Sequence, residues 1–500
     1  MEEKIASLKS LLAEWSDLSR AAFLLGWDQQ TYMPPKGIEA RGQQIGTLQK
    51  LAHERITSDE VGRLLEELQP YVDELPADSD ETRLVKVTRR MYNKKTRVPP
   101  AMVAELAELA SAGFGAWQVA RAESNFALFQ PHLEKLVDYR RRFAALFAPY
   151  DHVYDPLLDE YEPGMKTAQV QAIFSALRPQ QVELIREITS SPQVDDSFLH
   201  GYFEEQKQWD FGVEVVTKFG YDWERGRQDR AAHPFTIPIA LDDVRITTRF
   251  LQDYVGSALF STMHETGHAF YELGVARSLD RTPLADGASM AIHESQSRMW
   301  ENLVGRSMPF WEYFYPRLQE YFPSQLGNVD LKTFYKGINK VEPSLIRVEA
   351  DEATYKLHIM LRLELEIALM EGSLEVKDLP EAWNARVQDY LGLTPPNDAL
   401  GVLQDVHWSD GYFGYFPTYA LGNLVSAQLW ERINADIPDL TEQIRRGEFA
   451  ALLGWLIENI HCHGAKLEPQ ELVQRVTGTG IDPVPYMRYL RTKYSQIYGL

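Results

Sequence analysis

The sequence predicts a mostly helical chain with a small β-sheet, and two patterns predict it. Apolar residues recur at three- and four-residue steps over most of the chain, as they do on the buried face of an amphipathic helix. Runs of β-branched residues bounded by turn residues, which indicate strands, are scarce. No linker, repeat or shift in composition marks a boundary within the 500 residues. We therefore expect a single domain over residues 1–500 with two lobes.

The expected helices follow one another from the N-terminus. Apolar residues from Ile5 to Leu18 share one helix face, and Thr57 with Glu60 reads as a capping box ahead of a helix that continues through Val61. Breaks are expected at Pro99-Pro100, at Asp155–Gly164 and around Ser190–Asp196. Similar amphipathic patterns cover residues 100–148, 166–189, 251–273, 288–305, 345–372 and 424–460.

The clearest strand signal lies between residues 235 and 250. Residues 236–239 and 244–248 are rich in β-branched side chains and flank a turn-like Asp242-Asp243. This region is expected to supply the small sheet.

Composition narrows the classes of function. Lys and Arg number 51 against 72 Asp and Glu, so the net charge is −21, and 44% of residues are apolar. The apolar content excludes disorder, and the negative charge disfavours binding to nucleic acid or to lipid surfaces. The single cysteine, Cys462, excludes an intrachain disulfide, and neither a secretory signal nor an apolar run of about 18 residues is recognisable. We expect a cytoplasmic protein with no nucleic-acid or membrane partner.

The strongest local signal is the run His264-Glu265-Thr266-Gly267-His268. Residues four apart on a helix lie on one face, so both imidazoles can bind one metal ion. Glu265 then lies beside the ion and can take a proton from water. The alternative is two unrelated histidines on a packed or solvated helix face.

A catalytic zinc ion needs a third protein ligand, and a second helical segment offers His293 and Glu294. Glu294 is preferred because two histidines and one glutamate form an established hydrolytic ligand set. His293 lies about 100° around the helix from Glu294, so both side chains cannot easily reach the same ion.

Other residues stand out by chemistry rather than by spacing. Arg347 could bind a carboxylate with its fork, although a helix arginine is more often a surface charge. The aromatic, glycine-bearing run at residues 411–419 could offer phenol donors to an oxyanion or could be core packing. His461-Cys462-His463 is interpreted as structural, because residues two apart point away from each other on a helix.

Together these blocks resemble the carboxypeptidase Taq family of zinc metallocarboxypeptidases. The resemblance covers nearly the whole chain and is weakest at residues 165–230. It includes the opening run Trp27–Pro35. The family's signature blocks occur in order: His233-Pro234-Phe235, Asp243–Thr247, His264–His268, His293–Gln296, Ile346–Asp351 and Gly401–Trp408.

The resemblance implies an all-α, zincin-like metallopeptidase with a small sheet and a deep substrate groove between two lobes, usually assembled as a homodimer. It implies release of single amino acids from peptide carboxyl termini, with broad preference and poor action on proline. One Zn²⁺ per chain is implied, with Co²⁺ as a substitute, held by His264, His268 and Glu294.

The resemblance also implies roles for further residues. Glu265 is the implied general base and acid, and His407 with Tyr419 or Tyr415 is implied to stabilise the oxyanion. Arg347 is implied to hold the substrate's terminal carboxylate, and the implied substrate-binding set is completed by His233, Arg245 and Gln404.

Two other functions compete with this interpretation. An oligopeptidase that cuts peptides internally would use the same zinc ligands but would not need to capture a terminal carboxylate. A non-enzymatic helical scaffold would carry the His-Glu-x-x-His run by accident and would bind no stoichiometric metal.

Overall fold

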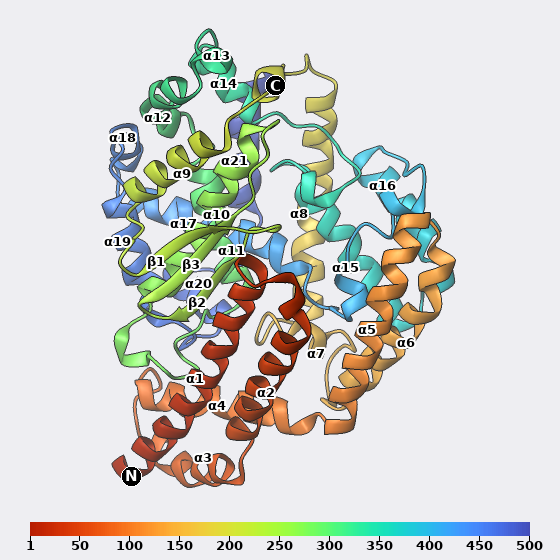
Figure 1. The fold of residues 1–500 in the computed structure, drawn as a ribbon, viewed down its shortest axis with the longest axis vertical. Coiled ribbons are helices and arrows are strands. Elements are labelled where there is room, and N and C mark those ends of the chain that lie inside the picture. Colours follow the sequence, from red (N-terminus) through yellow and green to blue (C-terminus); the bar gives the residue numbers. More distant parts are fainter. The chain divides into compact units, whose positions relative to one another are not determined.

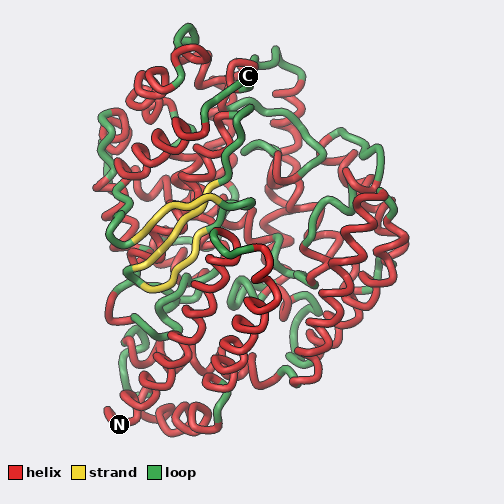
Figure 2. The backbone as a smooth tube through the Cα atoms, viewed as in Figure 1, coloured by secondary structure: helices red, strands yellow, loops and turns green.

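The computed structural model describes residues 1–500, in which helices dominate and the strands form one three-stranded sheet (Figures 1 and 2). The predicted fold class, a mostly helical chain with a small sheet, is confirmed. The chain divides into two units, each assembled from three stretches. The first contains Met1–Thr96, Asp196–Ile338 and Leu429–Thr477; the second contains Arg97–Asp195, Asn339–Gln428 and Gly478–Leu500.

The first unit carries the sheet and most of the short helices. Its helices are α1 (Glu2–Thr31), α2 (Ile38–Ile56), α3 (Asp59–Val72), α4 (Asp80–Arg97), α9 (Glu205–Phe219), α10 (Val255–Gly274), α11 (Met290–Arg298), α12 (Met308–Tyr321), α13 (Pro323–Leu326), α14 (Leu331–Ile338), α18 (Leu440–Arg445), α19 (Ala450–Asn459) and α20 (Pro469–Thr477).

The sheet has the order β1-β3-β2, with β1 (Gly226–Arg230) parallel and β2 (Thr236–Ala240) antiparallel to β3 (Asp243–Thr248). β2 and β3 confirm the two expected strands. β1 was not expected, because Gly-Arg-Gln-Asp-Arg contains no β-branched residue and forms a strand through its pairing with β3. Helix α10 packs against β2 and β3, so the sheet supports the helix that carries the two motif histidines.

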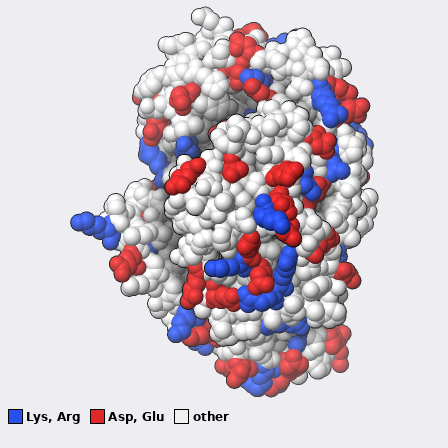
Figure 3. All heavy atoms as spheres, turned by 90° about the vertical axis from the view of Figure 1, so that its right-hand side faces the viewer, with Lys and Arg blue, Asp and Glu red and all other residues white.

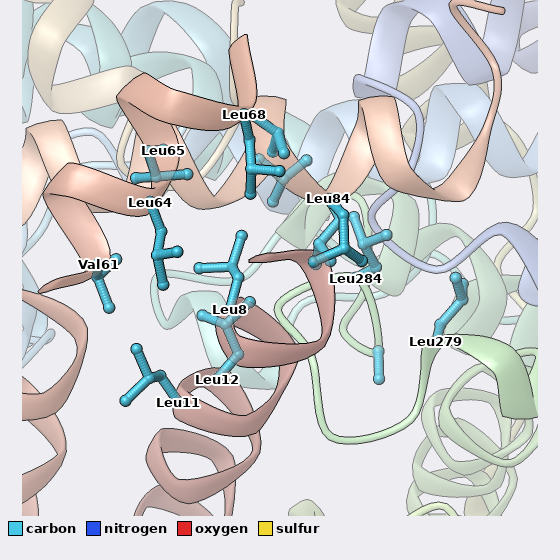
Figure 4. Packing of buried hydrophobic residues seen from close by; sticks show 14 of the residues in the cluster. Leu8, Leu11, Leu12, Val61, Leu64, Leu65, Leu68, Leu84, Leu279 and Leu284 are labelled. Carbon is cyan, nitrogen blue, oxygen red and sulfur yellow. The ribbon is translucent and has the colours of Figure 1, made fainter. Parts of the chain in front are cut away.

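A buried apolar cluster in the first unit joins α1, α3 and α4 (Figure 4). Leu8 and Leu12 of α1 pack there with Leu64 of α3, and all three side chains are 2% exposed or less. Leu279 and Leu284 belong to the same cluster, although they lie in the connection between α10 and α11. Burying each leucine contributes about 1.5–3 kcal/mol, so the cluster fixes the chain that leads from α10 into α11.

The remaining helices belong to the second unit. These are α5 (Pro100–Glu123), α6 (Phe126–Ala145), α7 (Asp155–Leu158), α8 (Thr167–Thr189), α15 (Tyr355–Glu371), α16 (Leu379–Leu391) and α21 (Val484–Tyr498), together with the first part of α17 (Pro417–Asp436). Helix α15 contacts α6, α8 and α16, and nearly all of its side chains are buried.

Several local expectations differ from the structure, and the patterns at residues 100–148 and 424–460 each cover more than one helix. The cap of α3 is Ser58, whose hydroxyl accepts the Val61 N–H, whereas the Thr57 hydroxyl donates back to the His53 carbonyl oxygen. Residues 345–372 are not one helix, because α15 starts only at Tyr355. The Asp351 carboxylate accepts the N–H groups of residues 353 and 354 in the turn that leads into the helix.

The charged surface mixes both signs. On the face drawn in Figure 3, Lys and Arg side chains lie among Asp and Glu side chains. Ion pairs such as Arg142–Glu105 and Arg317–Glu214 lie on the surface, where water screens them and they add little to stability. None of the helices combines the length and the apolar character that crossing a membrane requires.

Candidate active site

The two motif histidines and Glu294 come together in the first unit. His264 and His268 lie one turn apart on α10, and Glu294 lies on α11. Glu294 Oε2 is 3.7 Å from the Nε2 atom of each histidine. The ligand atoms of all three residues lie within 4.8 Å of one another.

Gly267 allows α11 to approach α10 closely enough for this convergence. A Cβ atom at Gly267 would lie 2.5 Å from the Cα atom of Ser297 and 2.7 Å from the carbonyl oxygen of Gln296, both on α11. Real Cβ atoms do not come so close to backbone atoms, so any larger residue would push the helices apart. The glycine inside the His-Glu-x-x-His run therefore lets α11 bring Glu294 to the two histidines of α10.

This donor set fits a divalent metal ion. Imidazole nitrogen and carboxylate oxygen are preferred zinc donors, and donors about 2.0–2.2 Å from one ion stand roughly 3.3–3.6 Å apart in tetrahedral geometry. The 3.7 Å separations between Glu294 and the two histidines agree with that spacing. Three protein donors leave the fourth position open, which distinguishes a catalytic site from a structural one.

His264 is oriented by the segment that follows α11. A π-helical turn, Met299–Val304, places Glu301 so that its Oε2 lies 2.9 Å from His264 Nδ1. An Nδ1–H that donates to this carboxylate leaves Nε2 free for a metal ion. Arg298 links both acids, donating from Nε to Glu294 Oε1 at 2.6 Å and from an Nη atom to Glu301 at 3.0 Å. Glu294 Oε1 is thus occupied, and Oε2 faces the histidines.

His268 is oriented by His293, the residue that competed with Glu294 as a ligand. The Nδ1 atoms of His268 and His293 are 2.8 Å apart, and His293 Nε2 lies 2.9 Å from Glu272 Oε1. When a neutral His293 donates from Nε2 to Glu272, its Nδ1 accepts from His268, which leaves His268 Nε2 unprotonated. Burial also lowers the pKa of His268 well below its ordinary value, which favours the neutral form.

Glu265 lies next to these donors but is held by the sheet. The Thr236 hydroxyl of β2 lies 2.7 Å from Glu265 Oε2 and 2.8 Å from the Glu265 carbonyl oxygen. The carboxyl is 6% exposed, and burial raises its pKa above the ordinary value. A carboxyl with a raised pKa accepts a proton readily near neutral pH, which suits a general base.

In the second unit Arg347 is buried, not exposed as a surface charge would be. It lies in a short 3₁₀ turn, Arg347–Glu349, and is 5% exposed. Its Nε and one Nη atom donate to Asp405 Oδ1 at 3.0 and 2.7 Å, and its other Nη atom donates to the Tyr355 hydroxyl at 2.8 Å. The fully buried Arg362 donates to the other oxygen of Asp405. Two guanidinium groups thus share one carboxylate.

His407 and the candidate tyrosines gather beside this cluster. The His407 ring lies 5.7 Å from that of Tyr415, and the Tyr415 ring lies 5.2 Å from that of Tyr419. The Arg347 guanidinium lies 5.4 Å from the Tyr419 ring. Burial lowers the pKa of His407 to about 4, so its imidazole is neutral at pH 7 and can donate one N–H. Gln404 joins the cluster through its Oε1, which accepts the Arg347 backbone N–H at 2.9 Å.

The remaining candidates lie elsewhere in the first unit. Arg245 on β3 is bound to Asp243 at 2.7 Å, and its guanidinium lies 4.2 Å from the Trp27 ring. His233 is exposed in the turn before β2. His461 is fully buried, and its Nε2 lies 2.9 Å from Gln296 Oε1, which fits the structural interpretation of that segment.

Four residues that contact the site residues were not predicted from the sequence: Thr236, Glu272, Arg298 and Glu301. The spacing could have predicted Arg298, because an arginine four residues after Glu294 on a helix lies on the same face. Glu301 carries none, because the π-helical turn changes the phase of the helix after Arg298.

Comparisons with known proteins agree with this geometry. The family described as carboxypeptidase Taq (M32) metallopeptidase matches residues 7–494. Thermostable carboxypeptidase 1 of Thermus thermophilus is 42% identical over 100% of this chain and 99% of its own. Carboxypeptidase 1 of Bacillus subtilis is 39% identical over 98% of each chain. The crystal structure of an M32 carboxypeptidase from Deinococcus radiodurans R1 is 39% identical, covers 100% of both chains and gives a TM-score of 0.97.

The chain belongs to the carboxypeptidase Taq (M32) family of metallopeptidases. The family resemblance stated from the sequence is confirmed. The protein is therefore a metallocarboxypeptidase, a hydrolase that acts on peptides and uses a divalent metal ion. This assignment favours carboxypeptidase activity over the internal-cutting alternative.

Proposed function

We propose that this metallocarboxypeptidase uses Zn²⁺, for which Co²⁺ can substitute, to release single amino acids from peptide carboxyl termini. The observation that carries the metal assignment is the convergence of His264, His268 and Glu294, one oxygen of Glu294 facing both imidazoles. We also propose broad side-chain preference and poor action on proline, as the family resemblance implies.

His264, His268 and Glu294 would hold the divalent ion, which would supply Lewis-acid polarisation of the scissile carbonyl group and a pKa for water lowered towards about 7. The chain supplies the proton transfers. Glu265 accepts the proton of the attacking water and passes it to the leaving amine. The Thr236 hydroxyl supports this role, since it fixes one oxygen of the Glu265 carboxylate and leaves the other free.

We assign capture of the terminal carboxylate to Arg347. The charge of its surroundings supports the assignment, because Arg347 and Arg362 carry two positive charges against the single negative charge of Asp405. A buried excess of positive charge is costly, and an incoming carboxylate removes the excess. Three of the five N–H donors of Arg347 are engaged with Asp405 and Tyr355, which leaves two for a substrate.

We assign stabilisation of the oxyanion to His407 with Tyr415 or Tyr419. A neutral imidazole and a phenol both donate hydrogen bonds, and removing one such donor typically costs about 2.7–4 kcal/mol of transition-state stabilisation. The lowered pKa of His407, about 4, supports this role, because its ring is then a neutral donor at pH 7. His233, Arg245 and Gln404 are proposed as further substrate-binding residues.

We further propose that the protein is a homodimer in the cytoplasm and that residues 1–500 form one catalytic domain. Family resemblance supports the dimer, and the free thiol of Cys462 is compatible with a reducing compartment. Light scattering behind size-exclusion chromatography checks the dimer directly.

The proposed carboxypeptidase activity is tested by mass spectrometry of a peptide digest. We expect a ladder of products shortened by one residue at a time from the carboxyl end and halted where proline becomes terminal. The same peptide with an amidated carboxyl terminus is expected to resist, because amidation removes the charge that Arg347 would bind. Chelator is expected to stop the reaction, and Zn²⁺ or Co²⁺ to restore it.

As a control, acetylating the amino terminus of the peptide is expected to leave its cleavage unchanged. Internal fragments or cleavage of the amidated peptide would contradict the proposal.

A further inference from the structure

Glu366 is a buried carboxyl in the second unit that the mechanism above does not use. It lies on α15 and is 0% exposed. Its Oε1 accepts the indole N–H of Trp408 at 2.7 Å. Its Oε2 accepts the backbone N–H of Gly414 at 2.9 Å and the hydroxyl of Tyr154 at 2.6 Å. One carboxylate thus binds three donors.

Two of these donors lie at the two ends of one short segment. Trp408 directly follows His407, and Gly414 directly precedes Tyr415. Between them, Arg140 of α6 donates from Nε to the Gly411 carbonyl oxygen at 2.6 Å. The bonds to Glu366 therefore fix the segment at the points where it reaches His407 and Tyr415.

Gly414 explains why the segment has little freedom to move. Its φ is +92°, and a Cβ atom there would lie 2.3 Å from the carbonyl oxygen of Leu157 on α7. Only glycine fits both this backbone conformation and this close approach. The segment is thus packed on the α7 backbone on one side and bound to the Glu366 carboxylate on the other.

We propose that Glu366 is a positioning residue for His407 and Tyr415. It binds no substrate itself but fixes the backbone on which both side chains are carried. This inference rests on the proposed oxyanion roles of these two residues.

The charge state of Glu366 sets the strength of this support. Burial raises its pKa to about 7, although the bonds from Gly414, Tyr154 and Trp408 and the charge of Arg362 lower it. The other ionisable groups that face it are Tyr154 and Tyr161, and burial raises the pKa of both phenols, so they stay neutral. Trp408 and Gly414 offer only N–H groups.

Only the ionised carboxylate can accept all three donors at once. A protonated carboxyl group has to donate its own O–H, which among the three partners only the Tyr154 hydroxyl can accept, and the bonds from Trp408 and Gly414 then lose the strength that a negatively charged acceptor gives them. The segment is therefore held most firmly above pH 7, and this hold weakens as the pH falls through about 7.

The positioning role of Glu366 is tested by comparing Glu366→Gln with Glu371→Gln in the metal-loaded enzyme. Glutamine keeps the size of the side chain but turns an N–H₂ group towards one of the three donors. The matched control makes the same change at the exposed carboxyl end of the same helix, where Glu371 pairs with His152. Hydrogen exchange of peptides covering residues 408–416 reports on the segment, and peptide hydrolysis gives kcat and KM.

For Glu366→Gln we expect faster exchange at residues 408–416 and a kcat about 100-fold lower, because small displacements of catalytic groups cost that much. KM and metal content are expected to stay within twofold, and the control to match the unmodified protein. The unmodified enzyme, which needs no substitution, is expected to gain protection in this segment between pH 6 and 8 after correction for intrinsic exchange.

Two contrary results have different meanings. Unchanged exchange in Glu366→Gln together with a flat pH series would overturn the positioning role. Faster exchange with an unchanged kcat would instead remove His407 and Tyr415 from the proposed chemistry, and with it the positioning role of Glu366. The metal content tests neither the positioning role of Glu366 nor the oxyanion roles of His407 and Tyr415, since it reports on residues of the other unit.

Discussion

Replacing Glu265 by glutamine is expected to lower kcat by about 10³–10⁴-fold while the metal ion stays bound. Glutamine has the size of glutamate and can still accept a hydrogen bond from Thr236, but it cannot take a proton from water. The proposed metal donors, His264, His268 and Glu294, are untouched by the change. Steady-state hydrolysis of a short peptide gives kcat, and elemental analysis of the dialysed protein gives the metal content.

Two further variants make this prediction specific. Glu265→Asp keeps a base but withdraws it by one methylene group, so we expect activity between those of the glutamine variant and the unmodified protein. Thr236→Val removes the hydroxyl that orients the carboxylate, and its loss of activity is expected to be smaller than that of Glu265→Gln. A glutamine variant with unchanged turnover would remove Glu265 from the mechanism.

The same change 29 positions further along the chain, at Glu294, is expected to lower the metal content. Glu294→Gln removes the charged donor, while Arg298 keeps Glu301 as a partner. Losing an outer-shell partner of a metal ligand typically lowers metal affinity 10–100-fold, so we expect the loss of this ligand to lower it by more than about 100-fold. Titration with Zn²⁺ or Co²⁺ against a competing chelator measures the affinity.

Excess metal separates the two glutamine variants. Added Zn²⁺ is expected to restore activity in part to Glu294→Gln, because binding is its main defect, and to do nothing for Glu265→Gln. Glu371→Gln again provides the matched control, with unchanged affinity expected. A Glu294→Gln protein that binds metal as tightly as the unmodified chain would contradict the assignment of Glu294 as a ligand.

The sequence predicts the parts of the site that depend on local periodicity. A spacing of four residues on a helix is sufficient to bring His264 and His268 to one face, and the structure has that helix. The choice of Glu294 over His293 rests on ligand chemistry and helix phase. In the structure His293 contacts His268 and is not one of the three residues, His264, His268 and Glu294, whose side-chain atoms converge.

The parts that depend on contacts between distant segments could not be predicted. Arg347 was expected within a helix, but α15 begins only at Tyr355, and Arg347 lies in a separate 3₁₀ turn before it. Its burial follows from pairing with Asp405, 58 positions away. Strand β1 forms because β3 offers it an edge, which no pattern within its own five residues indicates.

Anomalous X-ray scattering from crystals of the zinc-loaded protein tests the proposed metal ligands. We expect one strong peak per chain at the zinc absorption edge, about 2.0–2.2 Å from His264 Nε2, His268 Nε2 and Glu294 Oε2. Glu265 is predicted to remain outside bonding distance, with its carboxylate on Thr236. A peak at any other group of residues, or one that lacks Glu294 as a ligand, would overturn the proposed metal site.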